Sequence, residues 1–112
     1  MQLEEFDGKV DQILMAIEDA IEEADLDIEY DTVSGILNLE FPDRSHIIIN
    51  RQGATQQIWV AAKSGGYHFN YENNDWLDEK GGELLSVLLK TQIEQQLHQS
   101  TNLDLSNLSE GM

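Results

Sequence analysis

The chain has 112 residues, with 22 acidic side chains against six basic ones and a formal net charge of −16. This length supports one hydrophobic core, and a 40% share of hydrophobic residues favours a folded domain over a disordered one. So large a negative charge repels phosphate groups, which argues against nucleic acid and anionic membranes as partners and favours cations or basic protein surfaces.

Cysteine is absent, which excludes disulfides, a thiol nucleophile and any cysteine-ligated zinc or iron–sulfur site within the chain. The first ten residues do not have the apolar stretch of a signal peptide. No apolar run approaches the roughly 20 residues that a membrane-spanning helix needs. We therefore expect a cytoplasmic protein.

Residues 3–24 are predicted to form a long amphipathic helix. Its apolar side chains recur at spacings of three and four, namely Leu3, Phe6, Val10, Ile13, Leu14, Ile17, Ile21 and Ala24. Nearly all its polar positions are acidic. One stripe holds Asp7, Asp11, Glu18 and Glu22, with Asp19 and Glu23 beside it.

The apolar period then changes from 3.6 to two, which predicts a run of strands. These strands cover Leu26–Tyr30, Leu37–Phe41, His46–Asn50, Gln57–Lys63 and Tyr67–Tyr71, with a short sixth at Trp76–Leu77. The third contains the run Ile47–Ile48–Ile49 and is predicted to be buried. Short turns such as Ser34–Gly35 separate the strands, so they should pair as an antiparallel meander.

A second helix is predicted from just after Gly81–Gly82 to about His98, with a stripe of leucines and isoleucine on one face. We therefore predict an α+β domain over residues 1–112, built as a two-layer α-β sandwich of an N-terminal helix, an antiparallel sheet of five or six strands and a C-terminal helix. The tail, about 101–112, carries Leu103, Leu105 and Leu108, so it is either flexible or docked on the body.

Twelve of the 22 acids lie between Glu4 and Asp31, accompanied by a single base, Lys9. Carboxylates at i and i+4 on a helix can share a cation, and an open site keeps waters on the metal, so binding would be weak. The alternatives are a solvated face that confers solubility and a surface that docks a basic protein. Repulsion between like charges along the helix is a cost that solubility alone does not require.

Three segments in order resemble the central region of bacterial frataxins of the CyaY type: Ile47–Gln52, Gln57–Ala61 and Lys63–Phe69. They follow an acidic helix, as in that family. The resemblance implies an α-β sandwich that supports iron–sulfur cluster assembly, with iron on an acidic ridge and without a catalytic centre based on cysteine or histidine. It implies a cysteine desulfurase and an iron–sulfur scaffold protein as partners. We expect a monomer.

The acidic band and the resemblance together give the candidate metal ligands Asp7, Asp11, Glu18, Asp19, Glu22, Glu23, Asp25, Asp27 and Asp31. The resemblance also implies a partner-binding set of Glu18, Asp19, Glu22, Glu23, Asn50, Arg51, Gln57, Trp59 and His68, the last five on the solvent side of the sheet. Alternation with Ile58 and Val60 independently predicts that Trp59 points away from the helices. In some relatives a histidine stands where this chain has Asp7, so the site here would contain only oxygen ligands.

Two other functions remain open on the residues alone. An iron-oxidising or iron-storing protein would need a di-iron centre, usually with a Glu-x-x-His motif, and the sequence has none. An acidic adaptor would bind no metal specifically. The histidines His46, His68 and His98 are far apart in the sequence, which makes them poor candidates for a shared metal site.

Overall fold

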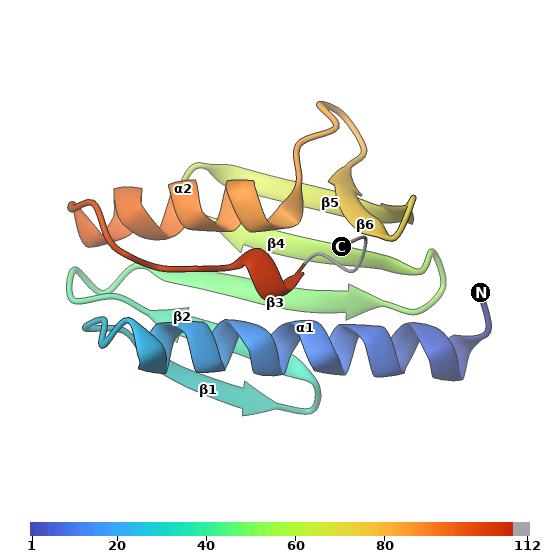
Figure 1. Ribbon diagram of the computed structural model, residues 1–112, viewed down its shortest axis with the longest axis horizontal. Coiled ribbons are helices and arrows are strands. Elements are labelled where there is room, and N and C mark those ends of the chain that lie inside the picture. The colour runs from blue at the N-terminus through green and yellow to red at the C-terminus, as the bar shows by residue number, and fades with distance from the viewer. Residues whose placement is uncertain (109–112) are drawn as a thin grey trace.

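The computed structural model describes residues 1–108, which form two layers (Figure 1). Helices α1 (Leu3–Glu23) and α2 (Leu85–Leu97) cover one face of a six-stranded antiparallel sheet. The strands neighbour one another in sequence order: β1 (Glu29–Val33), β2 (Ile36–Glu40), β3 (His46–Gln52), β4 (Gln57–Ala62), β5 (Gly65–Glu72) and β6 (Asp75–Asp78). The predicted fold class is confirmed.

The core lies between the sheet and the two helices. Phe6, Ile17 and Ile21 of α1 are buried there together with Leu88 and Ile93 of α2. Alternate residues of the central strands complete it, namely Leu37, Leu39, Ile47, Ile49, Ile58, Val60 and Phe69. The other face of the sheet is left open, so alternate strand residues are available for contacts outside the core.

The segment after α1 differs from the prediction, because it is a helix cap and not a strand. Asp25 adopts a left-handed backbone with φ of 53°, and the amides of Asp25 and Leu26 donate to the carbonyls of Glu22 and Ile21. This is the Schellman arrangement, in which the residue after the left-handed one packs back on the helix. The prediction of a strand at Leu26–Tyr30 is therefore wrong in its first half, and β1 begins at Glu29.

Two apolar residues lie outside the positions that their patterns predicted. Ile48 is 39% exposed, because it alternates with the buried Ile47 and Ile49 and so lies on the open face of the sheet. The third strand, predicted to be buried, is therefore buried on one face only. Leu3, assigned to the apolar stripe of α1, is 54% exposed in the first turn of the helix.

The tail packs against the helices as far as the described residues extend. Leu103, Leu105 and Leu108 are buried, and the short helix η1 (Ser106–Leu108) contacts both α1 and α2 (Figure 1). Glu94 of α2 accepts hydrogen bonds from the amide and hydroxyl of Thr101, which lowers the pKa of Glu94. Positions 109–112, which the sequence analysis included in the tail, lie outside the described residues.

No helix between residues 1 and 108 is both long and apolar enough to cross a bilayer.

Candidate functional site

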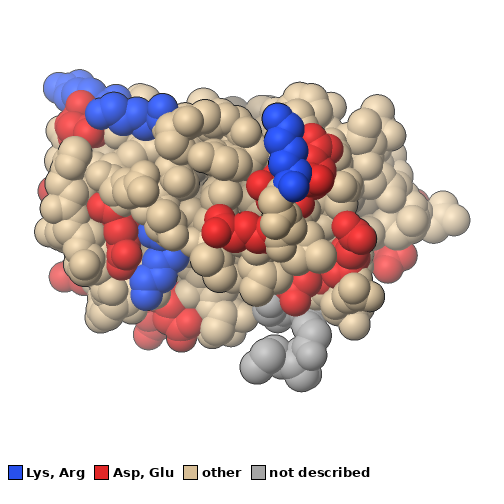
Figure 2. All heavy atoms as spheres, turned by 90° about the horizontal axis from the view of Figure 1, so that it is seen from above, with Lys and Arg blue, Asp and Glu red and all other residues tan. Residues whose placement is uncertain are grey.

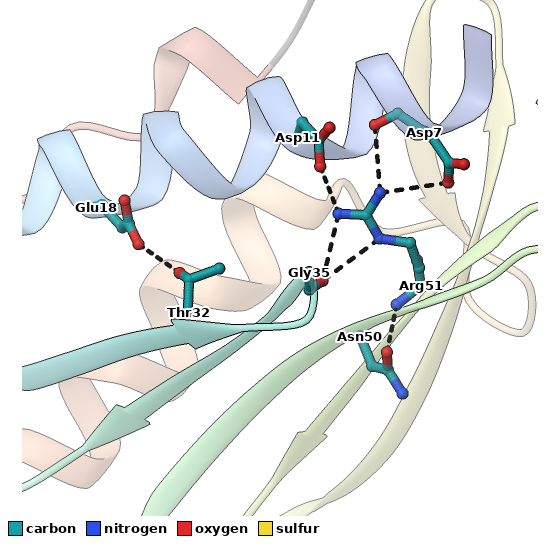
Figure 3. Close-up of polar contacts among 7 residues, drawn as sticks. All are labelled: Asp7, Asp11, Glu18, Thr32, Gly35, Asn50 and Arg51. Atoms are coloured by element: carbon teal, nitrogen blue, oxygen red, sulfur yellow. Dashed lines mark hydrogen bonds and ion pairs between the residues drawn. The ribbon is translucent and has the colours of Figure 1, made fainter. Parts of the chain in front are cut away.

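The first pair of acids on α1, Asp7 and Asp11, meets a cation supplied by the sheet. Arg51 of β3 reaches across to place Nη1 3.3 Å from Oδ1 of Asp7 and Nη2 2.6 Å from Oδ1 of Asp11 (Figure 3). The same guanidinium donates to the carbonyl of Gly35, in the turn between β1 and β2, at 3.3 and 3.4 Å. Arg51 therefore joins α1, β3 and this turn.

The turn leaves little space around that guanidinium. Gly35 has φ of +74°, and a Cβ built on it would lie 3.0 Å from Nη2 of Arg51. A side chain at Gly35 would therefore be strained in its backbone and would crowd the Arg51 guanidinium.

The second pair of acids on α1, Glu18 and Glu22, meets hydroxyl groups of β1. The Thr32 hydroxyl donates to Glu18 Oε2, and the Tyr30 hydroxyl donates to Glu22 Oε1 (Figure 3 shows the first contact). The hydrogen bond to Glu22 raises the pKa of Tyr30 to about 12, with the negative charges of Glu22, Glu18 and Asp19 adding to the effect. Both contacts attach α1 to the edge strand of the sheet.

The other candidate metal ligands are exposed side chains along the same edge of the molecule. These are Asp19, Glu23, Asp25, Asp27 and Asp31. Within residues 1–108, no group of three or more His, Asp or Glu side chains is placed to hold a metal ion. An iron ion on this surface would therefore keep most of its coordination sphere as water, as an open carboxylate surface permits.

The open face of the sheet carries a polar and aromatic row across three strands. Asn50, Trp59 and His68 are direct cross-strand neighbours on β3, β4 and β5. The Trp59 and His68 rings stack with their centroids 4.2 Å apart and an interplanar angle of 9°. Gln57 lies on the same face and accepts a hydrogen bond from Trp59 Nε1 at 2.9 Å. This row places four of the five predicted sheet residues together.

Arg51 is the exception, and its predicted place on the solvent side is wrong. It alternates with Asn50, shares its face with Ile47 and Ile49, and pairs across the ladder with the buried Ile58. That face is the one covered by α1, which is why its guanidinium reaches Asp7 and Asp11. The side chain of Arg51 is only 18% exposed.

Charge is distributed unevenly over the molecule. The helix α1 and strand β1 lie together along one edge (Figure 1), and residues 4–31, which cover most of both, hold twelve acids and one base. Figure 2 views the opposite edge, where basic and acidic side chains are interspersed. The strongest negative field is therefore at the α1–β1 edge.

Sequence reasoning did not identify the sheet residues that partner the acids of α1. Tyr30 and Thr32 are two residues apart on β1, so strand periodicity alone places them on one face. The predicted strand ended at Tyr30, so it did not include Thr32. Glu79 was also missed. It lies within 3.1 Å of both Gln57 and His68 but comes from a loop with no periodic pattern.

Comparison with known sequences identifies the family. A family model described as "Frataxin-like domain" matches residues 1–99. The chain belongs to the frataxin-like family. It is 45% identical over 96 residues to the iron–sulfur cluster assembly protein CyaY of Vibrio vulnificus, covering 86% of this chain and 92% of that protein. It is 48% identical over 86 residues to the protein of the same name from Photobacterium profundum, covering 77% and 82%.

Solved frataxin structures agree with this assignment. The frataxin of Psychromonas ingrahamii matches with a TM-score of 0.86 at 34% identity, covering 93% of this chain and 99% of that one. A ferrous-complexed trimeric frataxin from the yeast Saccharomyces cerevisiae matches with a TM-score of 0.68 at 28% identity, covering 85% and 87%. The resemblance found in the β3–β5 segments is thus confirmed at the level of the family.

Proposed function

We propose that this frataxin-like chain supports or regulates iron–sulfur cluster assembly by docking on a cysteine desulfurase and its scaffold protein. The observation that carries the proposal is the pairing of a strongly acidic α1–β1 edge with the half-buried Trp59–His68 stack on the open sheet face. The CyaY relatives are named as iron–sulfur cluster assembly proteins, which is why we propose this process. The two surfaces supply the means of contact.

The acidic edge is suited to a basic protein surface. A field of one sign steers oppositely charged partners and speeds their encounter, and the effect fades as salt screens it. Asp19 and Glu23 are exposed on α1, so their charges can reach a partner without breaking the contacts that Glu18 and Glu22 make with β1.

The sheet face offers the complementary contact. Tryptophan is enriched among residues that dominate binding energy, because its large ring buries much surface with little loss of conformational freedom. Trp59 is already stacked and hydrogen-bonded, so docking would not have to order it. Asn50 beside it offers an amide group for polar contacts.

Iron is proposed as the metal carried on the acidic edge. Carboxylate oxygens suit hard cations, and the yeast relative has been described with ferrous bound. The available ligands differ along α1. The single charge of Arg51 already offsets part of the charge of Asp7 and Asp11, whereas among the described residues Glu18 and Glu22 accept from neutral hydroxyls. We expect iron to bind first around Glu18, Asp19, Glu22 and Glu23.

The test is an NMR titration of isotope-labelled protein with its cognate cysteine desulfurase at low and moderate salt. Shifts or broadening should concentrate on α1, β1 and the Asn50–Trp59 face and should weaken with salt. Neutralising the edge with Asp19→Asn and Glu23→Gln should weaken binding roughly tenfold at low salt. The matched control neutralises two exposed acids elsewhere, with Glu72→Gln and Glu83→Gln.

Equal effects of the two double variants would show that only net charge matters and that the α1–β1 edge is not the docking surface. The absence of any spectral change at either salt would refute desulfurase docking. A separate anaerobic titration with ferrous iron should broaden the Glu18–Glu23 amides before those of Asp7 and Asp11. Broadening in the reverse order would contradict the proposed site.

A further inference from the structure

On the open face of the sheet, Glu79, a residue outside the proposed docking surface, connects the side chains of Gln57, Trp59 and His68. Glu79 directly follows β6, and its amide donates to the carbonyl of His68 at 2.9 Å. Its backbone therefore continues the pairing with β5 beyond the end of the strand. The side chain is 35% exposed, so it lies at the surface but is held close to the sheet.

The two carboxylate oxygens of Glu79 contact different neighbours. Oε1 accepts a hydrogen bond from Gln57 Nε2 at 3.0 Å, and Oε2 lies 3.1 Å from Nδ1 of His68. The backbone anchor and these two contacts leave the carboxylate little freedom to rotate. Glu79 is thus joined directly to one member of the Trp59–His68 stack and indirectly to the other.

The indirect connection runs through the amide of Gln57, whose side chain is buried among polar groups. Its Nε2 donates to Glu79 and also to Asn70 Oδ1 at 3.0 Å, and its Oε1 accepts from Trp59 Nε1 at 2.9 Å. Two acceptors on one side of the amide determine which way it faces, because a reversed amide would oppose donor to donor at the indole. Glu79 therefore helps to present an acceptor to Trp59.

The contacts form a closed ring: Glu79 binds Gln57, Gln57 binds Trp59, Trp59 stacks on His68, and His68 returns to Glu79. We propose that Glu79 is a positioning residue that holds Trp59 and His68 as one preformed anchor for the protein partner. This inference rests on the proposed function, since it gives a role to a residue behind the same docking surface. An anchor that is ordered before binding loses less entropy when the complex forms.

Three single variants separate positioning from charge. Glu79→Ala removes both acceptors, whereas Glu79→Gln keeps an oxygen for Gln57 and offers an NH₂ group to an unprotonated His68 Nδ1. Both remove one negative charge, as does Glu83→Gln, the control in the same loop. Glu83 has an exposed side chain for which no hydrogen bond or ion pair occurs among the described residues.

The first measurement is the solvent-exchange rate of the Trp59 indole N–H in the free protein, with the buried Trp76 indole as internal reference. Glu79→Ala should speed this exchange about fivefold or more, the effect of losing about one net hydrogen bond. The Glu79→Gln and Glu83→Gln proteins should stay within about twofold of the unmodified chain on the same scale. The second measurement is affinity for the cysteine desulfurase, which only Glu79→Ala should weaken beyond the charge control, by about fivefold.

An unchanged indole exchange rate in Glu79→Ala would overturn the positioning role. Equal weakening of binding by all three variants would also overturn it, because the effect would then be one of charge. If the unmodified chain does not bind the desulfurase, the proposed function fails by itself. The indole exchange rate then still decides whether Glu79 positions Trp59.

Discussion

At the scale of the residue, the pKa of Tyr30 shows how neighbouring carboxylates affect a surface side chain. Its hydroxyl donates to Glu22, and this hydrogen bond together with nearby carboxylates raises its pKa to about 12. A phenolate at this position would face negative charge and lose its acceptor, so the neutral form is favoured.

The pH dependence follows from the direction of that shift. A raised folded-state pKa means that the Tyr30 contact stabilises the protein fully below the ordinary tyrosine pKa of 10.0, and that this contribution is lost as the pH rises toward 12. In the Glu22→Gln protein we expect Tyr30 to ionise closer to 10.0, as measured by ultraviolet absorbance of the phenolate. The control is Glu72→Gln at the end of β5, which is separated from β1 by three strands. It should leave the titration of Tyr30 unchanged. An unaltered titration in Glu22→Gln would show that this contact does not form.

Single residues also show what strand periodicity can and cannot determine. Alternation correctly placed Trp59 on the open face, because its neighbours Ile58 and Val60 point into the core and successive side chains of a strand point to opposite faces. The same rule would have placed Arg51 with Ile47 and Ile49 toward α1, but Arg51 was assigned as part of a motif and not by its parity. Glu79 could not be found in this way, since only the folded chain brings its loop beside β5.

At the scale of the element, the Arg51 side chain is the principal polar connection between α1 and the centre of the sheet. Its guanidinium contacts two acids of α1 and the carbonyl of Gly35, and it is largely shielded from solvent. We expect Arg51→Ala to lower the free energy of unfolding by about 1–2 kcal/mol, because the largely buried guanidinium loses its hydrogen bonds. The carboxylates of Asp7 and Asp11 are 45% and 62% exposed, so solvent screens part of this energy. Chemical denaturation measures this change.

The control for Arg51→Ala is Lys80→Ala, which removes the same charge from an exposed loop side chain. It should shift the free energy of unfolding by less than about 0.5 kcal/mol, as exposed substitutions usually do. If the two variants were equally destabilised, general charge repulsion and not the Arg51 contacts would be responsible.

The tail is a second element whose contribution can be measured. Leu105 of the tail is only 5% exposed, so Leu105→Ala should cost about 2–4 kcal/mol through lost burial and the cavity that remains. Met15→Ala on the exposed side of α1, at 58% exposure, is the control and should be nearly neutral. Thermal and chemical unfolding of both proteins compare them directly. A neutral Leu105→Ala would mean that the tail is not docked in solution.

At the scale of the whole molecule, the net charge of −16 sets the response to salt. Repulsion among acids on α1 and β1 opposes folding, and added ions screen it. We expect the melting temperature to rise from low to moderate sodium chloride. The Asp19→Asn, Glu23→Gln double variant should show a smaller rise, because it removes two charges from the most negative edge. A melting temperature independent of salt in the unmodified chain would contradict this account.

Most of the global fold could be predicted from the sequence, because the helical and strand periods are strong in α1, α2 and the central strands. The sequence did not determine the junction at Asp25–Ile28, where apolar residues at alternate positions belong to a helix cap. The candidate site was predictable as a set of acids and a facing tryptophan. The pairing of each acid with its own sheet partner depends on how the layers are aligned, which no local pattern encodes.

The packing of η1 against α1 brings the last described residues of the chain onto its first helix. A ribosome releases the chain from its N-terminus, so α1 and all six strands emerge before Leu103, Leu105 and Leu108 are available. Because each strand pairs with the next one in the sequence, the strands can pair as they emerge. The part of α1 that the tail covers stays exposed to solvent until the tail has emerged. Nascent chains stalled before residue 103 should therefore be cleaved by protease more readily than chains whose first 108 residues have cleared the exit tunnel.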